Sequence, residues 1–202
     1  MSSSYFEFTT RKDLRNWLVA NSKTETECWL VMSISIQTNT LLYLDIVEEA
    51  LCFGWIDGVK KKLPDNRLIQ RISPRSKRSN WTELNKARVR RLEALGLMTT
   101  AGRAVLPEMD PNLFEWDARI VEALQQDDVV YQNFRTFPIL YQTIRIDTIQ
   151  SYKKDTELFN KRLEKLIKYT KANKMYGSWH DNGRLLDDNQ KHFLDTTTKK
   201  LK

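Results

Sequence analysis

The pattern of hydrophobic positions changes its period within the first forty residues of the chain. Leu14, Trp17 and Leu18 recur at helical spacing, and Thr9 or Thr10 can cap the helix that they predict, which ends near residue 21. Between residues 27 and 36, apolar residues alternate with others at a period of two. This alternation predicts a half-buried β-strand that ends before Asn39.

A second amphipathic helix follows over residues 43–53. Its apolar side consists of Ile46, Val47, Ala50 and Leu51, and Gly54 suits the left-handed residue just past a helix end. Glu48 and Glu49 fall outside this apolar side. The pattern therefore predicts that both carboxylates face water.

The next two β-prone runs predict an antiparallel hairpin. WIDGVKKK (55–62) and RLIQRIS (67–73) flank the turn residues Leu63-Pro64-Asp65-Asn66, and Pro74 closes the second run. Glycine at 58 inside a strand is typical of a bulge or of a close backbone approach.

Helical periods dominate after the hairpin. Ser79 or Asn80 can cap a helix over about 81–95 that stops at Gly96, and Thr99 or Thr100 can cap a short helix that ends before Pro107. From residue 108 onward the period is mostly helical, and the clearest late helix covers about 156–172.

This order of elements predicts an α+β fold, in which a small antiparallel sheet with a basic β-hairpin is covered by helices. We expect an α+β body over residues 1–110, a helical C-terminal part over 111–186 packed on that body, and a polar, partly disordered tail over 187–202.

Composition narrows the class of protein. The chain of 202 residues is 41% hydrophobic and 29% charged, and no apolar run approaches the roughly 18 residues of a membrane span. The N-terminus lacks the basic and apolar regions of a secretory signal. Cys28 and Cys52 form no CxxC pair, and the two histidines lie near the C-terminus. We therefore expect a cytoplasmic protein without a metal site, a disulfide framework or a cofactor.

Positive charge is concentrated between residues 60 and 91. This segment holds twelve Lys or Arg against two acids, a net +10, whereas the whole chain carries +7, so the remainder sums to −3. A basic hairpin beside a helix can contact an anion or track a nucleic-acid backbone. The candidate contacts are Lys60, Lys61, Lys62, Arg67, Arg71, Arg75, Lys77 and Arg78, with Lys86, Arg90 and Arg91 exposed on the helix that follows.

The same pattern has two other interpretations. It is also typical of a solvated surface, since no named nucleic-acid motif occurs. An anionic membrane surface is the other possible partner, but the chain lacks an amphipathic helix with bulky apolar residues opposite clustered lysines that would favour it. Under any of these interpretations, we expect Arg75 and Arg78 to be accessible to solvent.

The helix predicted over 81–95 places an arginine within an apolar stripe. Arg88 shares the stripe with Trp81, Leu84, Leu92 and Leu95, and Asn85 borders it. A guanidinium in such a position either forms a structural ion pair, for instance with Asp57 or Glu49, or lines a pocket for an anionic ligand. We expect Asp57 and Arg88 to lie close enough to interact. The candidate pocket residues are Trp55, Asp57, Trp81, Asn85 and Arg88, although both tryptophans also suit a core.

Three motifs in this region occur in the order of a known family. GWIDG (54–58), PRSKRSNWTELNKAR (74–88) and GLMTTAG (96–102) make the chain resemble the bacterial bacteriocin-protection family, also called YdeI/OmpD-associated, over roughly residues 10–170. The resemblance implies a small bacterial cytoplasmic protein that protects against antimicrobial peptides and envelope stress. It implies no defined reaction.

Three molecular functions follow from these residues. The first is a non-enzymatic protein that binds an anionic ligand or a protein partner within the region 55–91. The second is a nucleic-acid-binding protein that uses the basic hairpin and the following helix. The third is an enzyme that uses Asp57 and Arg88, for which a single acid without a second catalytic group is weak support.

Overall fold

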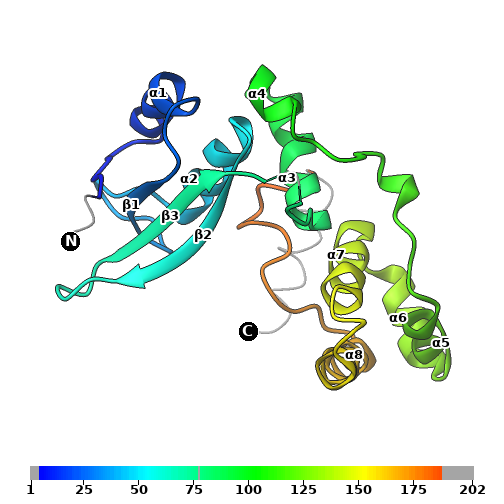
Figure 1. Cartoon of the computed structure of the whole chain (residues 1–202). Coiled ribbons are helices and arrows are strands. Elements are labelled where there is room, and N and C mark those ends of the chain that lie inside the picture. The colour runs from blue at the N-terminus through cyan, green and yellow to red at the C-terminus, as the bar shows by residue number, and fades with distance from the viewer. Residues whose placement is uncertain (1–4, 77, 188–202) are drawn as a thin grey trace. The chain divides into compact units, whose positions relative to one another are not determined.

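The structure is a computed structural model that describes residues 5–76 and 78–187. It has an α+β fold with a three-stranded antiparallel sheet, as predicted (Figure 1). The described residues form two compact units: 5–81 with 88–109, and 82–87 with 110–187. Lys77 and residues 188–202 of the tail expected over 187–202 lie outside the described residues.

The first unit contains the sheet. Its strands are β1 (Cys28–Met32), β2 (Trp55–Lys62) and β3 (Leu68–Pro74), in the order β1-β3-β2. The helices α1 (Arg11–Asn21) and α2 (Tyr43–Cys52) pack on each other and share one core with the sheet. The short helix α4 (Thr100–Arg103) packs on α2.

Helix α1 begins where the sequence predicts. The Thr10 side chain accepts a hydrogen bond from the Asp13 backbone N–H, and the Asp13 carboxylate accepts one from the Thr10 N–H, so the two residues form a capping box. Leu14 and Leu18 are fully buried on the face that meets α2. The prediction of this helix is confirmed.

Strand β1 is buried on both of its faces. Leu30 and Met32 face the main core, whereas Trp29 and Val31 form a second cluster with Ile69. The predicted half-buried alternation is therefore wrong, because apolar residues cover the second face as well. The strand also ends at Met32, and the residues at 34 and 36, predicted to continue it, are exposed.

The hairpin and its bulge are confirmed. Asp57 pairs with Ile72, but the register shifts before Lys60 pairs with Gln70. The buried Gln70 side chain donates to the backbone oxygen of Gly58 at 3.0 Å and so satisfies a carbonyl that the bulge removes from the ladder. A Cβ at Gly58 would lie 3.3 Å from the end of the Arg71 side chain, which would have to shift by a few tenths of an ångström to accept it.

Helix α3 (Glu83–Ala94) starts two residues later than predicted. Its cap is Thr82, whose hydroxyl accepts from the Asn85 N–H at 3.2 Å, rather than Ser79 or Asn80. Residues 83–87 of the helix, with the cap, belong to the second unit and residues 88–94 to the first. Leu95 lies past the helix end and is 53% exposed, so it leaves the predicted apolar stripe.

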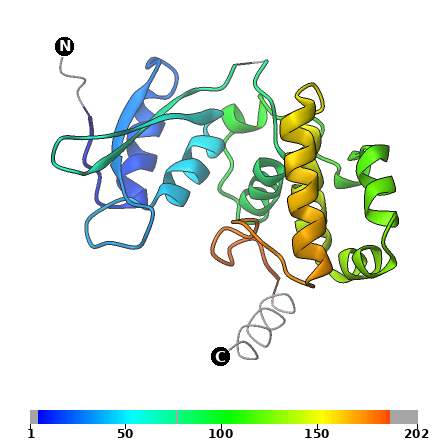
Figure 2. The same cartoon turned by 90° about the horizontal axis from the view of Figure 1, so that it is seen from below.

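The second unit is helical. After the short 3-10 helix η1 (Pro111–Leu113), its helices are α5 (Ala118–Gln125), α6 (Asp128–Thr136), α7 (Ile139–Gln150) and α8 (Thr156–Lys171). Helix α8, whose bounds confirm the predicted late helix, packs on α6 and α7 and is seen along its length in Figure 2. In the described part of the chain, no helix is long and apolar enough to cross a membrane.

Candidate functional site

Four of the five predicted pocket residues belong to the first unit and one to the second. Trp55 is 1% exposed, contacts the edge of Trp17 and donates its indole N–H to the Ser22 carbonyl at 3.2 Å, so it is a core residue. Asn85 belongs to the second unit. Arg88 is buried in the first unit, as its position in an apolar stripe predicted. Asp57 and Trp81 remain as candidates.

Asp57 has neighbours other than the predicted one. Its carboxylate accepts a hydrogen bond of 2.7 Å from the Tyr43 hydroxyl at the start of α2. Its charge acts on the guanidinium of Arg75, and among the described residues it forms no ion pair with Arg88. The expected interaction between Asp57 and Arg88 is therefore not formed.

Arg75, which follows the last residue of β3, is the cation near Asp57. It is only 6% exposed, so the expectation of an accessible Arg75 is wrong. Its guanidinium carbon lies 3.8 Å above the centre of the Trp81 ring, and Nη1 donates to the Asn80 carbonyl at 3.0 Å. The loop that follows β3 thus folds back over the arginine.

The rest of the Arg75 guanidinium has no partner among the described residues. Nε and Nη2 are both buried, and neither donates a hydrogen bond. These two nitrogens present parallel N–H bonds on one edge of a guanidinium, and this edge matches the two oxygens of a carboxylate or phosphate. A buried donor without an acceptor costs about 1–3 kcal/mol. The arrangement therefore leaves two buried donors on one edge of the guanidinium without an acceptor.

The electrostatics of the site agree with this geometry. Burial lowers the pKa of the Arg75 guanidinium from its ordinary value, and the negative charge of Asp57 opposes this shift. Arginine nevertheless remains protonated at any physiological pH. Arg75 is thus a desolvated cation, and the nearby Asp57 carboxylate forms no hydrogen bond with it. Hydrogen bonds to an anionic group would replace the stabilisation that water no longer provides.

Two of the other predicted basic contacts, Arg67 and Arg71, are neutralised by acids. Arg67 pairs with Glu7 and Asp65 at 2.7 Å each, and Arg71 reaches Glu27 at 3.4 Å. The Lys61 ammonium lies 4.5 Å from the centre of the Trp29 ring. The structure describes Lys60, Lys62 and Arg78 as exposed, without an ion pair to a described residue. The basic hairpin is therefore less open to a polyanion than its composition predicts.

The basic residues of α3 are also engaged. Lys86 pairs with Glu83 at 2.8 Å, Arg90 donates to the Met109 carbonyl at 3.2 Å, and Arg91 pairs with Glu48 at 3.0 Å. All three are half-buried. Their expected exposure is wrong.

The acids of α2 form a second cluster of buried charge. Glu48 and Glu49 are each 1% exposed, so the prediction that they face water is wrong. Arg11 bonds to both carboxylates, Arg15 pairs with Glu49 at 2.9 Å, and Arg91 pairs with Glu48. Because three arginines surround the two acids, this cluster has the character of a structural ion network.

The thiols provide no reactive group. Cys28 and Cys52 are free and buried, and burial raises the pKa of the first to about 12 and of the second to about 11. A neutral thiol is a poor nucleophile and metal ligand. Among the residues described, no group of three or more His, Cys, Asp or Glu is placed to hold a metal ion.

Comparison with known proteins gives a family match over part of the chain and no activity. Residues 6–105 match the model of a family described as a domain of unknown function (DUF8412). This range includes the sheet, α2, Arg75 and α3. No curated protein and no solved structure matches the chain.

Proposed function

We propose that this protein is a non-enzymatic binding protein whose first unit holds an anionic group of a ligand or partner on Arg75. The observation that carries the proposal is the pair of buried donors, Nε and Nη2, that no described residue accepts from. Trp81 and the Asn80 carbonyl hold the guanidinium plane in place before a ligand arrives. A carboxylate or a phosphate group has the two oxygens that this edge requires.

Because both donors are shielded from solvent, the ligand gains access when Asn80 and Trp81 move away from the guanidinium. The hydrogen bond from Arg75 to the Asn80 carbonyl and the contact with the Trp81 ring are the contacts that must then be given up. This movement exchanges these contacts for charge-assisted hydrogen bonds, which are about twice as strong as neutral ones.

The resemblance to the bacteriocin-protection family supports a biological role for this site. Arg75, Asn80 and Trp81 all lie within the PRSKRSNWTELNKAR motif on which the resemblance rests. We propose that binding at Arg75 contributes to bacterial protection against antimicrobial peptides. Its ligand would then be an anionic group of the cell, since such peptides are themselves cationic.

The binding test follows the Arg75 Nε–H signal by NMR during titration with acetate and with inorganic phosphate. We expect this signal to shift and saturate, and Arg75→Leu to abolish binding of both anions. Arg78→Leu is the matched control, because Arg78 lies in the same loop but is exposed. Unchanged binding in Arg75→Leu, or an equal loss in Arg78→Leu, contradicts a specific site and favours a diffuse basic surface.

The variant Asp57→Asn distinguishes a ligand-binding role of Arg75 from a purely structural one. If Arg75 serves a ligand, removal of the adjacent negative charge should strengthen anion binding, because the carboxylate repels the same anions. If Asp57 and Arg75 only stabilise the fold, the variant should lose stability without a gain in binding. In cells lacking the protein, Arg75→Leu should reduce survival under a cationic peptide at equal abundance, whereas Arg78→Leu should not.

A further inference from the structure

The second unit contains a cavity that the sequence did not predict. Its volume is about 580 Å³, within the range of small-molecule sites. Helices α5, α6 and α7 and the segment before α5 supply its walls. The residues lining it are Trp116, Val121, Leu124, Tyr131, Phe134, Arg135, Phe137, Ile139 and Gln142.

The aromatic wall of this cavity is fixed by ring contacts. Trp116 meets Phe134 edge to face, with ring centres 5.9 Å apart, and Phe134 meets Phe137 in the same manner at 6.5 Å. Phe134 and Phe137 are buried, so the rings have little freedom to rearrange. A preformed aromatic surface of this kind suits a flat, apolar ring.

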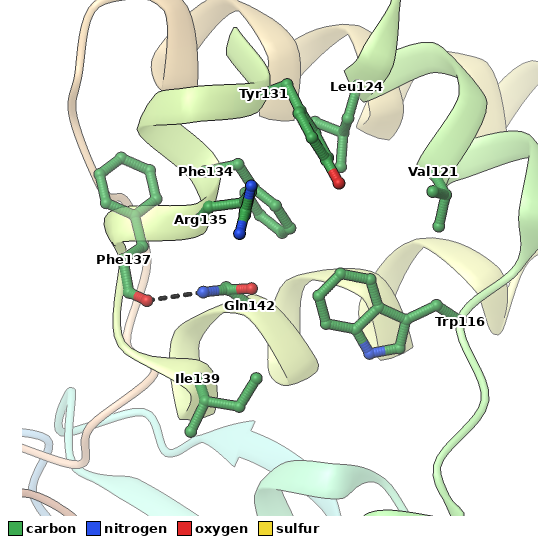
Figure 3. Close-up of a pocket in the computed structure, with 9 residues that line it drawn as sticks. All are labelled: Trp116, Val121, Leu124, Tyr131, Phe134, Arg135, Phe137, Ile139 and Gln142. Atoms are coloured by element: carbon green, nitrogen blue, oxygen red, sulfur yellow. Dashed lines mark hydrogen bonds between the residues drawn. The ribbon is translucent and has the colours of Figure 1, made fainter.

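Gln142 supplies a buried polar group. The residue is 7% exposed, and its side-chain nitrogen donates to the Phe137 carbonyl at 2.6 Å. This bond fixes the amide orientation and turns the side-chain oxygen away from Phe137 and into the space beside Trp116 (Figure 3). In the part of the chain that the structure describes, nothing donates to that oxygen. The oxygen therefore provides an acceptor for a ligand N–H or O–H.

Arg135 adds a positive charge to the same space. Its guanidinium points toward Gln142 in Figure 3, and its carbon lies 5.6 Å from the Tyr131 ring centre. No described carboxylate pairs with it. Tyr131 directs its hydroxyl into the same space (Figure 3). An aromatic wall, one acceptor and one unpaired cation thus converge on a single cavity.

We infer that this cavity binds a planar aromatic acid that carries an N–H or O–H donor. The ring packs against Trp116 and Phe134, the donor bonds to the Gln142 oxygen, and the acidic group pairs with Arg135. This site lies wholly in the second unit and is independent of Arg75. The two proposals can therefore fail separately.

Indole-3-acetate is a suitable first probe because it combines the three features. We expect saturable binding by isothermal titration calorimetry, and NMR shifts confined to residues that line the cavity. Indole lacks the acidic group and naphthalene-1-acetate lacks the N–H donor, so each should bind about tenfold more weakly. Acetate alone should not bind at this site.

Arg135→Gln should weaken indole-3-acetate binding about tenfold and leave indole binding unchanged. The control Lys161→Gln removes the same charge from an exposed position on α8 and should change neither affinity. Trp116→Leu should weaken all ring-containing probes. The inference is overturned if indole-3-acetate does not bind the full chain, or if Arg135→Gln and Trp116→Leu both leave its affinity unchanged.

Discussion

The two clusters of buried charge in the first unit differ in how completely the protein satisfies them. Three arginines surround Glu48 and Glu49, and both carboxylates accept hydrogen bonds on each oxygen, although one buried nitrogen of the cluster, Arg11 Nη2, has no acceptor. Arg75 donates to one carbonyl and stacks on one aromatic ring, and two of its buried nitrogens have no acceptor. Removing one partner of a well-paired buried charge destabilises the fold. A buried guanidinium that has two nitrogens without an acceptor can still donate hydrogen bonds to a ligand, as we propose for Arg75.

The largest expected effect comes from breaking the complete cluster. Glu49→Ala leaves Arg11 and Arg15 without their shared acid and should lower the free energy of unfolding by about 3 kcal/mol, the lower end for a buried pair because both arginines are partly exposed. Urea denaturation measures this loss. Glu93→Ala, which breaks the exposed pair with Arg103, is the control and should cost at most about 1 kcal/mol. Equal losses would remove the distinction between the clusters.

Arg75→Leu should change stability far less than Glu49→Ala. The substitution removes a cation–π contact and one hydrogen bond, but it also removes two unsatisfied donors, so the free energy of unfolding should stay within about 1 kcal/mol of the parent. The same denaturation series measures it. A loss as large as that of Glu49→Ala would assign Arg75 a structural role.

Asp147, in the second unit, is a half-buried acid that forms no ion pair with a described arginine, so unlike Glu48 and Glu49 it should make the stability depend on pH. Burial raises the pKa of Asp147. The Glu83 backbone N–H donates a hydrogen bond of 3.0 Å to the carboxylate and opposes this shift. A raised pKa in the folded state means that the native protein binds more protons above the unfolded pKa of about 3.9. The contribution of Asp147 to the free energy of unfolding is therefore fully present below that pH. It is lost as the pH rises through the pKa of Asp147 in the folded protein.

Asp147→Asn should abolish this decline while it keeps an oxygen that can accept from Glu83. The variant should gain stability relative to the parent between pH 3.5 and pH 7, as measured by chemical denaturation at both values. Asp155→Asn serves as the control, since Asp155 is an exposed helix cap. A parallel pH profile for the parent and Asp147→Asn would show that burial of this acid carries no penalty.

The smallest effect on stability is expected for the basic hairpin. Replacement of Lys60, Lys61 and Lys62 together by alanine should change the free energy of unfolding by about 1 kcal/mol or less, because all three are exposed and only Lys61 contacts a ring. Electrophoretic mobility of duplex and single-stranded nucleic acid at low salt tests the alternative function. Retardation by the parent that the triple variant loses would favour nucleic-acid binding over the receptor at Arg75.

The sequence by itself determined the local elements of this protein. The capping residues before Leu14, the turn between the β-prone runs and the glycines at 54 and 58 act within a few residues of themselves, so helix α1, the hairpin and its bulge could be predicted. The apolar stripe that contains Arg88 also depends only on helical periodicity. These features gave the α+β class.

Only the tertiary structure decided which charges are buried. Glu48 and Glu49 lie off the apolar side of α2, but arginines from α1 and α3, up to 43 residues away in the sequence, neutralise them. The PRSKRSNW motif identified Arg75 as notable, but its burial depends on a loop that returns Trp81 to the arginine. The cavity that Gln142 lines likewise forms only where helices α5, α6 and α7 come together. Period and composition describe one element at a time, whereas desolvation and pairing depend on which distant elements meet.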